Sequence, residues 1–129
     1  MITSLQNPAI KNITKLSKSK ERREQQLFVI EGARELSLAI QSNYKIEAVY
    51  VCREKFRDTK YPQVLDSIPE NDVIDISPAV FEKVAYRENS DGLVALARPK
   101  THGLKDIKLS QNPFIIVLEA VEKPGNLGA

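Results

Sequence analysis

The stretch LFVIEGARELSLAI, residues 27–40, decides the fold of this chain because a strand pattern passes directly into a helix pattern. Residues 27–30 are apolar without interruption, which predicts a buried strand. Glu31 and Gly32 then open a helix. The apolar residues that follow recur at the spacing of one helix face: Ala33, Leu36, Ala39 and Ile40. A strand that leads into a helix is the repeating unit of α/β proteins.

The same alternation continues along the chain. Further strands are predicted at residues 46–52, 73–76 and 92–97. Helices are predicted at residues 62–68 and 78–85, the second after a Ser77-Pro78 cap, and residues 53–60 are expected to form a polar connection. This order of elements predicts an α/β layered sandwich rather than an all-α or all-β fold.

The N-terminal region is predicted to hold an amphipathic helix with a basic face. Asn7 and Pro8 have the pattern of an N-cap followed by proline at the first helical position. Apolar residues follow on one face: Ala9, Ile13 and Leu16. Basic residues fall within about a 60° arc on the roughly opposite face: Lys11, Lys15, Lys18 and Arg22. If one helix continues through Ser17 and Ser19, these four form a cationic ridge, and a break near the serines would split it.

Positive charge is concentrated at the same end of the chain. Residues 1–23 hold six basic residues and one acidic residue, a net charge of +5. The remaining residues hold thirteen basic and sixteen acidic residues, a net charge of −3. Such asymmetry favours a polyanionic partner, whose phosphates lysine and arginine can bind without reading sequence. A solvated helix face is the plainer interpretation of four such cations.

Other features of the sequence exclude several classes of protein. No apolar run approaches the ~20 residues of a membrane span, so no membrane partner is expected. The N-terminus lacks the layout of a secretory signal, which indicates a cytoplasmic protein. The single cysteine, Cys52, lies in a predicted strand, and the single histidine, His102, lies in a polar segment. Neither a zinc site nor a Cys–His catalytic pair can be built from them, so no metal is expected.

Aromatic residues give a weaker indication of nucleic-acid binding. Tyr44, Tyr61 and Tyr86 lie near the ends of predicted elements, where a base could stack. The same placement is normal for amphipathic residues at the rim of a core. The polar loop RENSDG, residues 87–92, is an ordinary turn or an RNA contact. On these residues alone, the chain has the parts of a binding module rather than of a catalyst.

The C-terminal part differs in character from the rest. Residues 98–113 lack periodicity and are expected to be an interdomain linker between a domain at 1–97 and the start of another at 114–129. Residues 114–118 form a continuous apolar run, which predicts a strand, and residues 124–128 predict a turn. We expect a protein cut where a second domain begins. The strand, without its sheet neighbours, is expected to pair with another chain or pack against its own domain.

The chain resembles the N-terminal substrate-binding domain of SpoU/TrmH-type RNA 2′-O-ribose methyltransferases, which belong to the SPOUT class. The resemblance is carried by Asn7, Ile10-Lys11, Leu16, Arg22 six residues before Phe28, Glu31-Gly32-Ala33-Arg34, Gly92-Leu93-Val94-Ala95 and the tail Pro124-Gly125-Asn126-Leu127-Gly128-Ala129. It implies a three-layer α/β/α sandwich like that of ribosomal and kink-turn RNA-binding proteins, followed by the first strand of a truncated knot domain.

The resemblance also implies an activity and a site. The full-length protein would transfer a methyl group from S-adenosylmethionine to a ribose 2′-hydroxyl in tRNA or rRNA, and would form a homodimer through its knot domain. Asn126 and Gly128 match the first motif of the catalytic loop, although Glu119 and Glu122-Lys123 depart from the usual acidic pattern. Arg22 and Arg34 match basic positions that contact RNA, and Lys11 matches less specifically. The cofactor motifs lie beyond Ala129, so this chain is expected to bind no cofactor and to be inactive alone.

Two other functions remain open from the sequence. One is a non-enzymatic RNA-binding protein of the kink-turn or ribosomal type, for which the apolar run and the PGNLGA tail would have no use. The other is a protein-interaction module whose basic helix binds an acidic partner. RNA competition against DNA and polyglutamate would separate them.

Overall fold

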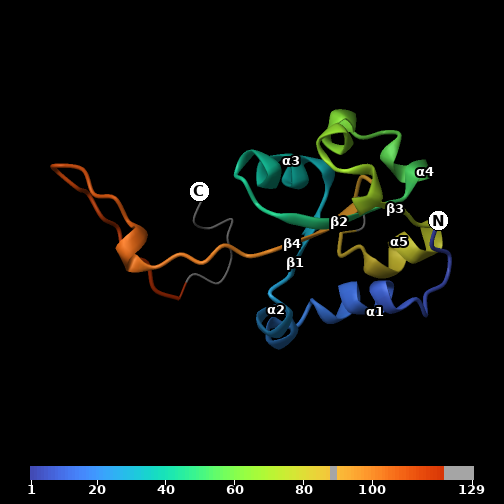
Figure 1. The fold of residues 1–129 in the computed structure, drawn as a ribbon, viewed down its shortest axis with the longest axis horizontal. Helices are drawn as coiled ribbons and strands as arrows, with labels where there is room; N and C mark the ends of the chain where they lie inside the picture. Colours follow the sequence, from blue (N-terminus) through green and yellow to red (C-terminus); the bar gives the residue numbers. More distant parts are fainter. Residues whose placement is uncertain (88–89, 121–129) are drawn as a thin grey trace.

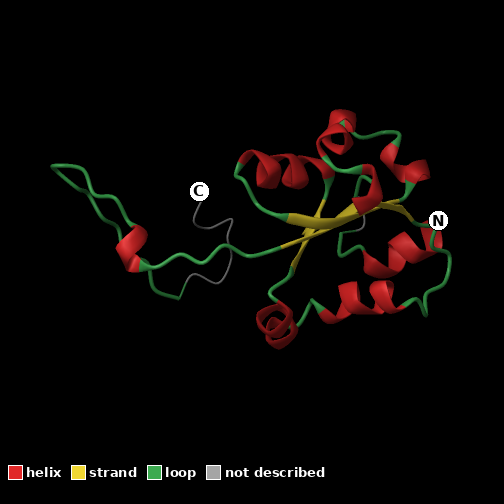
Figure 2. Cartoon of the chain, in the orientation of Figure 1, coloured by secondary structure: helices red, strands yellow, loops and turns green. Residues whose placement is uncertain are grey.

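A four-stranded mixed sheet with helices on both faces makes up the folded part of the chain (Figures 1 and 2). The structure is a computed structural model and describes residues 1–87 and 90–120. The strands are β1 (Phe28–Glu31), β2 (Ile46–Val51), β3 (Val73–Asp75) and β4 (Leu93–Ala97). Their order in the sheet is β1-β4-β2-β3. β4 is antiparallel to both β1 and β2, and β3 is parallel to β2.

The central strand β4 explains why the sheet is covered on both faces. All five of its residues are buried, and successive side chains point to opposite faces. Leu93, Ala95 and Ala97 contribute to one hydrophobic core, and Val94 and Leu96 to the other. A strand with no polar face is stable only between two covering layers.

The first covering layer packs on the face that carries Leu93 and Ala95. It consists of α3 (Ala33–Gln41), α4 (Arg53–Phe56) and the 3-10 helix η1 (Pro62–Ser67). Leu36 of α3, Phe56 of α4 and Val64 of η1 meet in this core. A second short 3-10 helix, η2 (Glu70–Asp72), leads into β3.

The second covering layer consists of α1 (Pro8–Lys15) and α5 (Pro78–Val84), which pack together on the opposite face. Ile10 and Ile13 of α1 contact a core shared with Val80 and Phe81 of α5. Asn7 caps α1 as expected, because its Oδ1 accepts a hydrogen bond from the backbone N–H of Ala9 at 2.9 Å. The α/β sandwich predicted from the sequence is therefore confirmed, with three layers. Cys52 is buried in this second core.

The N-terminal helix does not continue through the serines. α1 ends at Lys15, and α2 (Ser19–Gln25) begins after Lys18, whose backbone is extended. Figure 1 shows the two helices as separate elements at the bottom of the view, with α2 seen nearly end-on. Of the two alternatives, the break near Ser17 and Ser19 is the one observed, so the predicted basic ridge is split between two helices.

Two predictions about the elements are corrected. Residues 53–56 form the helix α4 where only a polar connection was expected, because Phe56 reaches the first core. The short helix expected at residues 62–68 is present as a 3-10 helix at residues 62–67. The strand expected at residues 114–118 is wrong, because in the described structure these residues form no strand and are 56% to 89% exposed. An apolar run becomes a strand only beside a hydrogen-bonding neighbour, and the structure places none there.

Residues 98–120 extend away from the sandwich (Figure 1). Their regular structure is one 3-10 turn, η3 (Leu104–Asp106). Arg98 at the start of this segment donates its backbone N–H to the carbonyl oxygen of Lys45 at 2.9 Å. None of the helices within residues 1–87 and 90–120 is long and apolar enough to cross a bilayer.

Candidate nucleic-acid interface

The structure separates the five basic residues predicted to contact RNA into two groups. Lys11 and Lys15 are exposed on α1, Lys18 is exposed between α1 and α2, and Arg22 is half-buried on α2. Arg34 is exposed on α3, in the layer on the other face of the sheet. Four of the five therefore lie on the α1–α2 side, and Arg34 does not.

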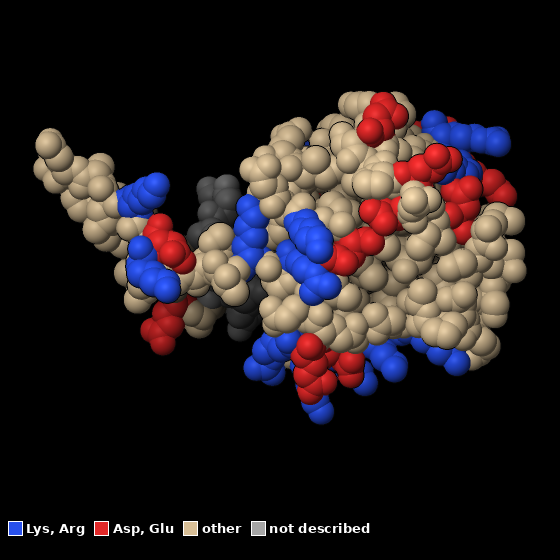
Figure 3. Space-filling model, in the orientation of Figure 1, with Lys and Arg blue, Asp and Glu red and all other residues tan. Residues whose placement is uncertain are grey.

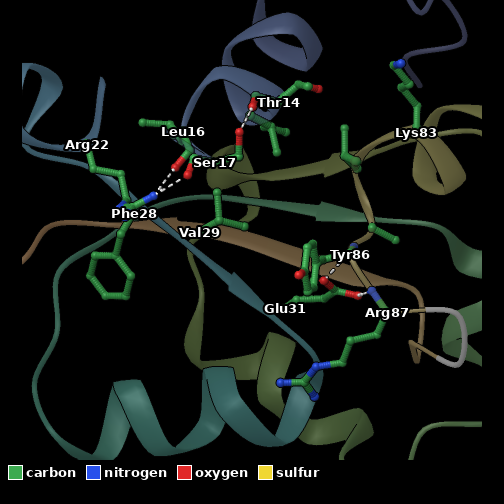
Figure 4. Close-up of a pocket in the computed structure, with 13 residues that line it drawn as sticks. Thr14, Leu16, Ser17, Arg22, Phe28, Val29, Glu31, Lys83, Tyr86 and Arg87 are labelled. Carbon is green, nitrogen blue, oxygen red and sulfur yellow. Dashed lines mark hydrogen bonds between the residues drawn. The ribbon is translucent and has the colours of Figure 1, made fainter. Parts of the chain in front are cut away.

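Arg22 holds the turn between α1 and α2. Its Nη1 donates hydrogen bonds to the carbonyl oxygen of Leu16 at 2.9 Å and to that of Ser17 at 2.6 Å (Figure 4). These carbonyls belong to the C-terminal end of α1, where helical partners are missing and a cation is favoured. Nη1 of the Arg22 guanidinium is thus used inside the protein.

A second contact joins the two helices at their sides. Asn12 of α1 and Gln25 of α2 exchange hydrogen bonds through their side-chain amides, at 2.8 and 2.9 Å. Gln25 also donates to a carboxylate oxygen of Glu21 at 3.1 Å. Together with Arg22, this pair fixes the orientation of α2 relative to α1, and we call the resulting unit, residues 8–25, the α1–α2 elbow.

The elbow presents positive charge to solvent. Figure 3 shows Lys and Arg along the lower edge of the sandwich, where α1 and α2 lie in Figure 1, with some carboxylates among them. Lys20 pairs with Glu24 at 3.8 Å. Lys11, Lys15 and Lys18 form no ion pair with any residue that the structure describes. Their charge is therefore available to a ligand.

A groove of about 690 Å³ adjoins the elbow, and we call it the β1 groove. It lies at the edge of the sheet, because β1 has one neighbouring strand, β4, in the described structure. The end of α1, part of β1 and the end of α5 form its walls (Figure 4). Its polar lining includes three cationic groups, two hydroxyls, one carboxylate and one phenol: Arg22, Lys83, Arg87, Thr14, Ser17, Glu31 and Tyr86.

Glu31, at the end of β1, holds the rim of this groove. Its carboxylate accepts hydrogen bonds from the backbone N–H groups of Tyr86 at 2.8 Å and Arg87 at 3.0 Å (Figure 4). The Arg87 guanidinium reaches across to Glu35 of α3 at 3.2 Å. The backbone beside Tyr86 is therefore fixed, while the Tyr86 side chain is 96% exposed.

The other two tyrosines singled out from the sequence are engaged elsewhere. Tyr44 packs edge-on against Phe28, with ring centroids 5.7 Å apart, and the Lys100 ammonium lies 4.8 Å from its ring centroid. Tyr61 packs against the first core. Of the three, Tyr86 alone offers a free ring for stacking.

Two residues of the groove could not be singled out from the sequence as groove residues. Lys83 belongs to a different helix from the basic ridge, and Glu31 was considered only as the start of a helix and as part of the Glu31-Gly32-Ala33-Arg34 motif. Glu31 reaches the groove from the end of β1 and Lys83 from α5, and the two elements meet where the backbone N–H groups of Tyr86 and Arg87 bond to Glu31. Asn126 and Gly128, the predicted catalytic-loop residues, lie outside the described residues. Among those described, no cluster of three or more metal-ligating side chains occurs.

Comparison with known proteins identifies related sequences. Residues 7–95 match the family described as MRM3-like substrate-binding domains. A curated relative, an uncharacterised tRNA/rRNA methyltransferase of Synechocystis sp., is 30% identical over 98% of this chain and 46% of its own length. The chain therefore spans about half the length of that relative.

Solved structures show the same fold. An RNA 2′-O ribose methyltransferase is 36% identical with a TM-score of 0.78, over 98% of this chain and 48% of the other. An rRNA methyltransferase from Sinorhizobium meliloti is 25% identical with a TM-score of 0.66, over 82% and 39%. The SpoU methyltransferase AviRb from Streptomyces viridochromogenes, solved with AdoMet, is 16% identical with a TM-score of 0.65 and covers 81% and 40%, a likeness of fold alone.

Proposed function

Because this chain belongs to the family of MRM3-like substrate-binding domains, we propose that it is the N-terminal RNA-binding part of a SpoU/TrmH-type tRNA or rRNA ribose 2′-O-methyltransferase. The relatives named above are methyltransferases by name, and this chain covers 39% to 48% of their lengths. In this proposal the chain recognises and holds the RNA, and the full-length enzyme transfers the methyl group.

The observation that supports RNA binding is the α1–α2 elbow. Lys11, Lys15 and Lys18 project from a unit whose two helices are locked together by Arg22 and by the Asn12–Gln25 pair. Lysines on a preorganised support can bind backbone phosphates, with affinity gained from counterion release. Arg34, on α3, would contact RNA only if the RNA also reaches the other face of the sheet.

The cofactor proposed for the full-length enzyme is S-adenosylmethionine. In the β1 groove the carboxylate that could bind its ribose hydroxyls or its ammonium group is that of Glu31, and two backbone N–H groups already occupy part of its acceptor capacity. We propose that the cofactor site belongs to a part of the enzyme outside the described residues, as the resemblance to SpoU/TrmH enzymes implies. Asn126 and Gly128 are proposed to shape the catalytic loop there. A ribose 2′-hydroxyl is a weak nucleophile, so positioning of the RNA by this domain is central to the rate.

The proposal is tested by the salt dependence of RNA binding. The purified chain is compared with Lys11→Gln/Lys15→Gln by fluorescence anisotropy, using tRNA and rRNA fragments over a range of salt concentrations. Each lysine that contacts a phosphate contributes about 1 to the slope of log K against log salt. The double variant is therefore expected to bind more weakly and to lower the slope by about 2.

The matched control is Arg57→Gln/Lys60→Gln. Both residues are exposed in the first covering layer and, within the described structure, form no ion pair. This control removes the same net charge and is expected to change the slope little. Equal effects of the two double variants would contradict a specific role for the elbow, and absence of RNA binding by the unmodified chain would contradict the proposed function.

A further inference from the structure

We propose that the β1 groove binds one unpaired nucleotide of the RNA, whose base stacks on the ring of Tyr86. This inference rests on the proposed function and assigns the class of RNA feature that the domain selects. The elbow lysines then contact the backbone of the adjoining stem, and the substrate is an RNA in which a helix adjoins an unpaired loop or bulge.

The first argument is the state of the Tyr86 ring. A tyrosine ring is usually partly buried by the core or by its neighbours, yet this side chain is 96% exposed. Its backbone is not free, because the N–H groups of Tyr86 and Arg87 both donate to Glu31. A ring on a fixed backbone keeps its place with little ordering cost when a base stacks on it.

The second argument is that Asp91, five residues after Tyr86, is also tied to the β1–α3 turn. Asp91 accepts hydrogen bonds from the backbone N–H of Ala33, at 3.1 and 3.0 Å, and from the hydroxyl of Thr59 at 3.0 Å. The segment that carries Tyr86 is thus attached to the β1–α3 turn through Glu31 and through Asp91. No contact in the described structure uses the Tyr86 ring for this attachment, so the ring is available to a ligand.

The third argument is the charge around the groove. Arg22 and Lys83 lie on opposite sides of it, and Tyr86 lies between them (Figure 4). If a nucleotide stacks on Tyr86, the phosphates on its 5′ and 3′ sides would each lie near one of these two cations. The carboxylate of Glu31 opposes this less than a free carboxylate would, because two backbone N–H donors already bind it. A volume of about 690 Å³ falls in the range of small-ligand sites.

An unpaired nucleotide fits these features better than a paired one. Bases within an A-form helix are stacked on each other, and their faces cannot reach an aromatic side chain, whereas loop bases can. Lys83 and Arg22 alone would serve either form of RNA. The ring of Tyr86 is the feature that distinguishes them.

The experiment compares two RNAs with the same stem. One is a hairpin with an unpaired loop that carries a single 2-aminopurine, and the other is the blunt duplex. Tyr86→Ala is expected to weaken hairpin binding about tenfold, the loss typical of one base–aromatic stack, and to change duplex binding less than about twofold. Tyr86→Phe is expected to retain hairpin binding, because the stacking face is kept. Quenching of 2-aminopurine on binding is expected with Tyr and Phe and is lost with Ala.

Several outcomes would overturn the inference. One is equal weakening of hairpin and duplex by Tyr86→Ala, and another is no effect on either. A third is competition: if polyglutamate displaces the labelled hairpin as effectively as unlabelled hairpin RNA, the groove binds an acidic protein instead. The proposed function is judged separately by Lys11→Gln/Lys15→Gln, which is expected to weaken hairpin and duplex alike. If salt-dependent RNA binding requires these lysines but not Tyr86, the proposed function stands and the proposed stacking site is wrong.

Discussion

Asp91 caps a helix that begins 58 residues earlier in the chain, because its carboxylate accepts hydrogen bonds from the backbone N–H of Ala33. Gly32 occupies the N-cap position of α3 and has no side chain for this role. A carboxylate at a helix N-terminus both satisfies a free N–H and interacts favourably with the helix dipole. The cap thus links the β1–α3 turn to the segment that precedes β4.

Asp91→Ala is expected to lower the free energy of unfolding by about 1 to 2 kcal/mol, the range for losing a capping side chain. Urea unfolding followed by circular dichroism measures this. Asp66→Ala removes an exposed carboxylate from η1, where the structure gives it no hydrogen-bond partner, and is expected to cost less than about 0.5 kcal/mol. Equal costs for the two variants would show that the distant cap does not stabilise α3.

Gly92 is required where the chain enters β4. Its φ is +81°, and a Cβ there would lie 2.6 Å from the backbone N of Phe56 and 2.8 Å from the carbonyl oxygen of Cys52. Gly92→Ala is therefore expected to cost at least about 2 kcal/mol of stability, because strain and a backbone clash add. Gly103→Ala is the control, since its Cβ would meet atoms no closer than 3.6 Å. Urea midpoints that fall equally for both variants would contradict this reading of Gly92.

The position of Tyr86 depends on Glu31, which gives a separate prediction. Glu31→Ala removes the acceptor of two backbone N–H groups and is expected to cost about 1 to 2 kcal/mol. It should also weaken binding of a looped hairpin more than binding of a blunt duplex, because the stacking ring is no longer held. Glu70→Ala, on an exposed residue of η2, should change neither quantity. If the Glu31→Ala variant keeps its full preference for the hairpin, the Glu31 carboxylate is not what holds Tyr86 in place.

The layers of the fold could be predicted because each depends on local patterns. Uninterrupted apolar runs marked β1, β4 and, from Ala48 onward, β2. Asn7-Pro8 and Ser77-Pro78 marked the starts of α1 and α5. The resemblance to SpoU/TrmH substrate-binding domains is confirmed by the family match over residues 7–95. These features can be recognised from neighbouring residues alone, or from the order of the family's motifs along the chain.

The rest could not be predicted because it depends on contacts between distant residues. The residues between α1 and α2 include neither glycine nor proline, and the turn is closed by Arg22 bonding to carbonyls five and six residues back. The β1 groove joins residues of α1, β1 and α5 that no spacing relates. The apolar run at 114–118 indicated a strand but carried no information about a neighbouring strand.

Arg22 is expected to stabilise the fold as well as to contact RNA. Arg22→Gln removes a charged donor to Leu16 and Ser17 and should cost about 1 to 2 kcal/mol, a range reduced for partial exposure. Arg23→Gln, on the next and exposed residue, removes the same charge and should cost less than about 0.5 kcal/mol. Urea unfolding without RNA compares them. If both variants unfold at the same urea concentration as the parent chain, Arg22 does not lock the α1–α2 elbow.

The start of the segment at 98–113 is held by a charge cluster that responds to pH. The Arg98 guanidinium, hydrogen-bonded to Glu47 at 2.6 Å, and then the Lys45 ammonium at 3.0 Å, hold the pKa of the Glu47 carboxyl below its ordinary value of 4.5. A carboxyl whose pKa is lowered by folding stabilises the folded state when it is ionised. Its contribution is thus fully present above pH 4.5 and is lost as pH falls through the lower, folded pKa.

Glu47→Gln is therefore expected to lower stability by up to about 1 kcal/mol near neutral pH, the range for ion pairs at the surface. The difference between the variant and the parent chain should shrink as pH falls below 4.5, because the parent then loses the same charge. Urea unfolding at several pH values measures the difference directly, and Glu70→Gln controls for removing an exposed carboxylate. A difference that stays constant through this acidic range would mean that Glu47 acts through packing or neutral hydrogen bonds. The charge cluster would then not be what holds Arg98 in place, nor what sets the direction in which the chain leaves β4.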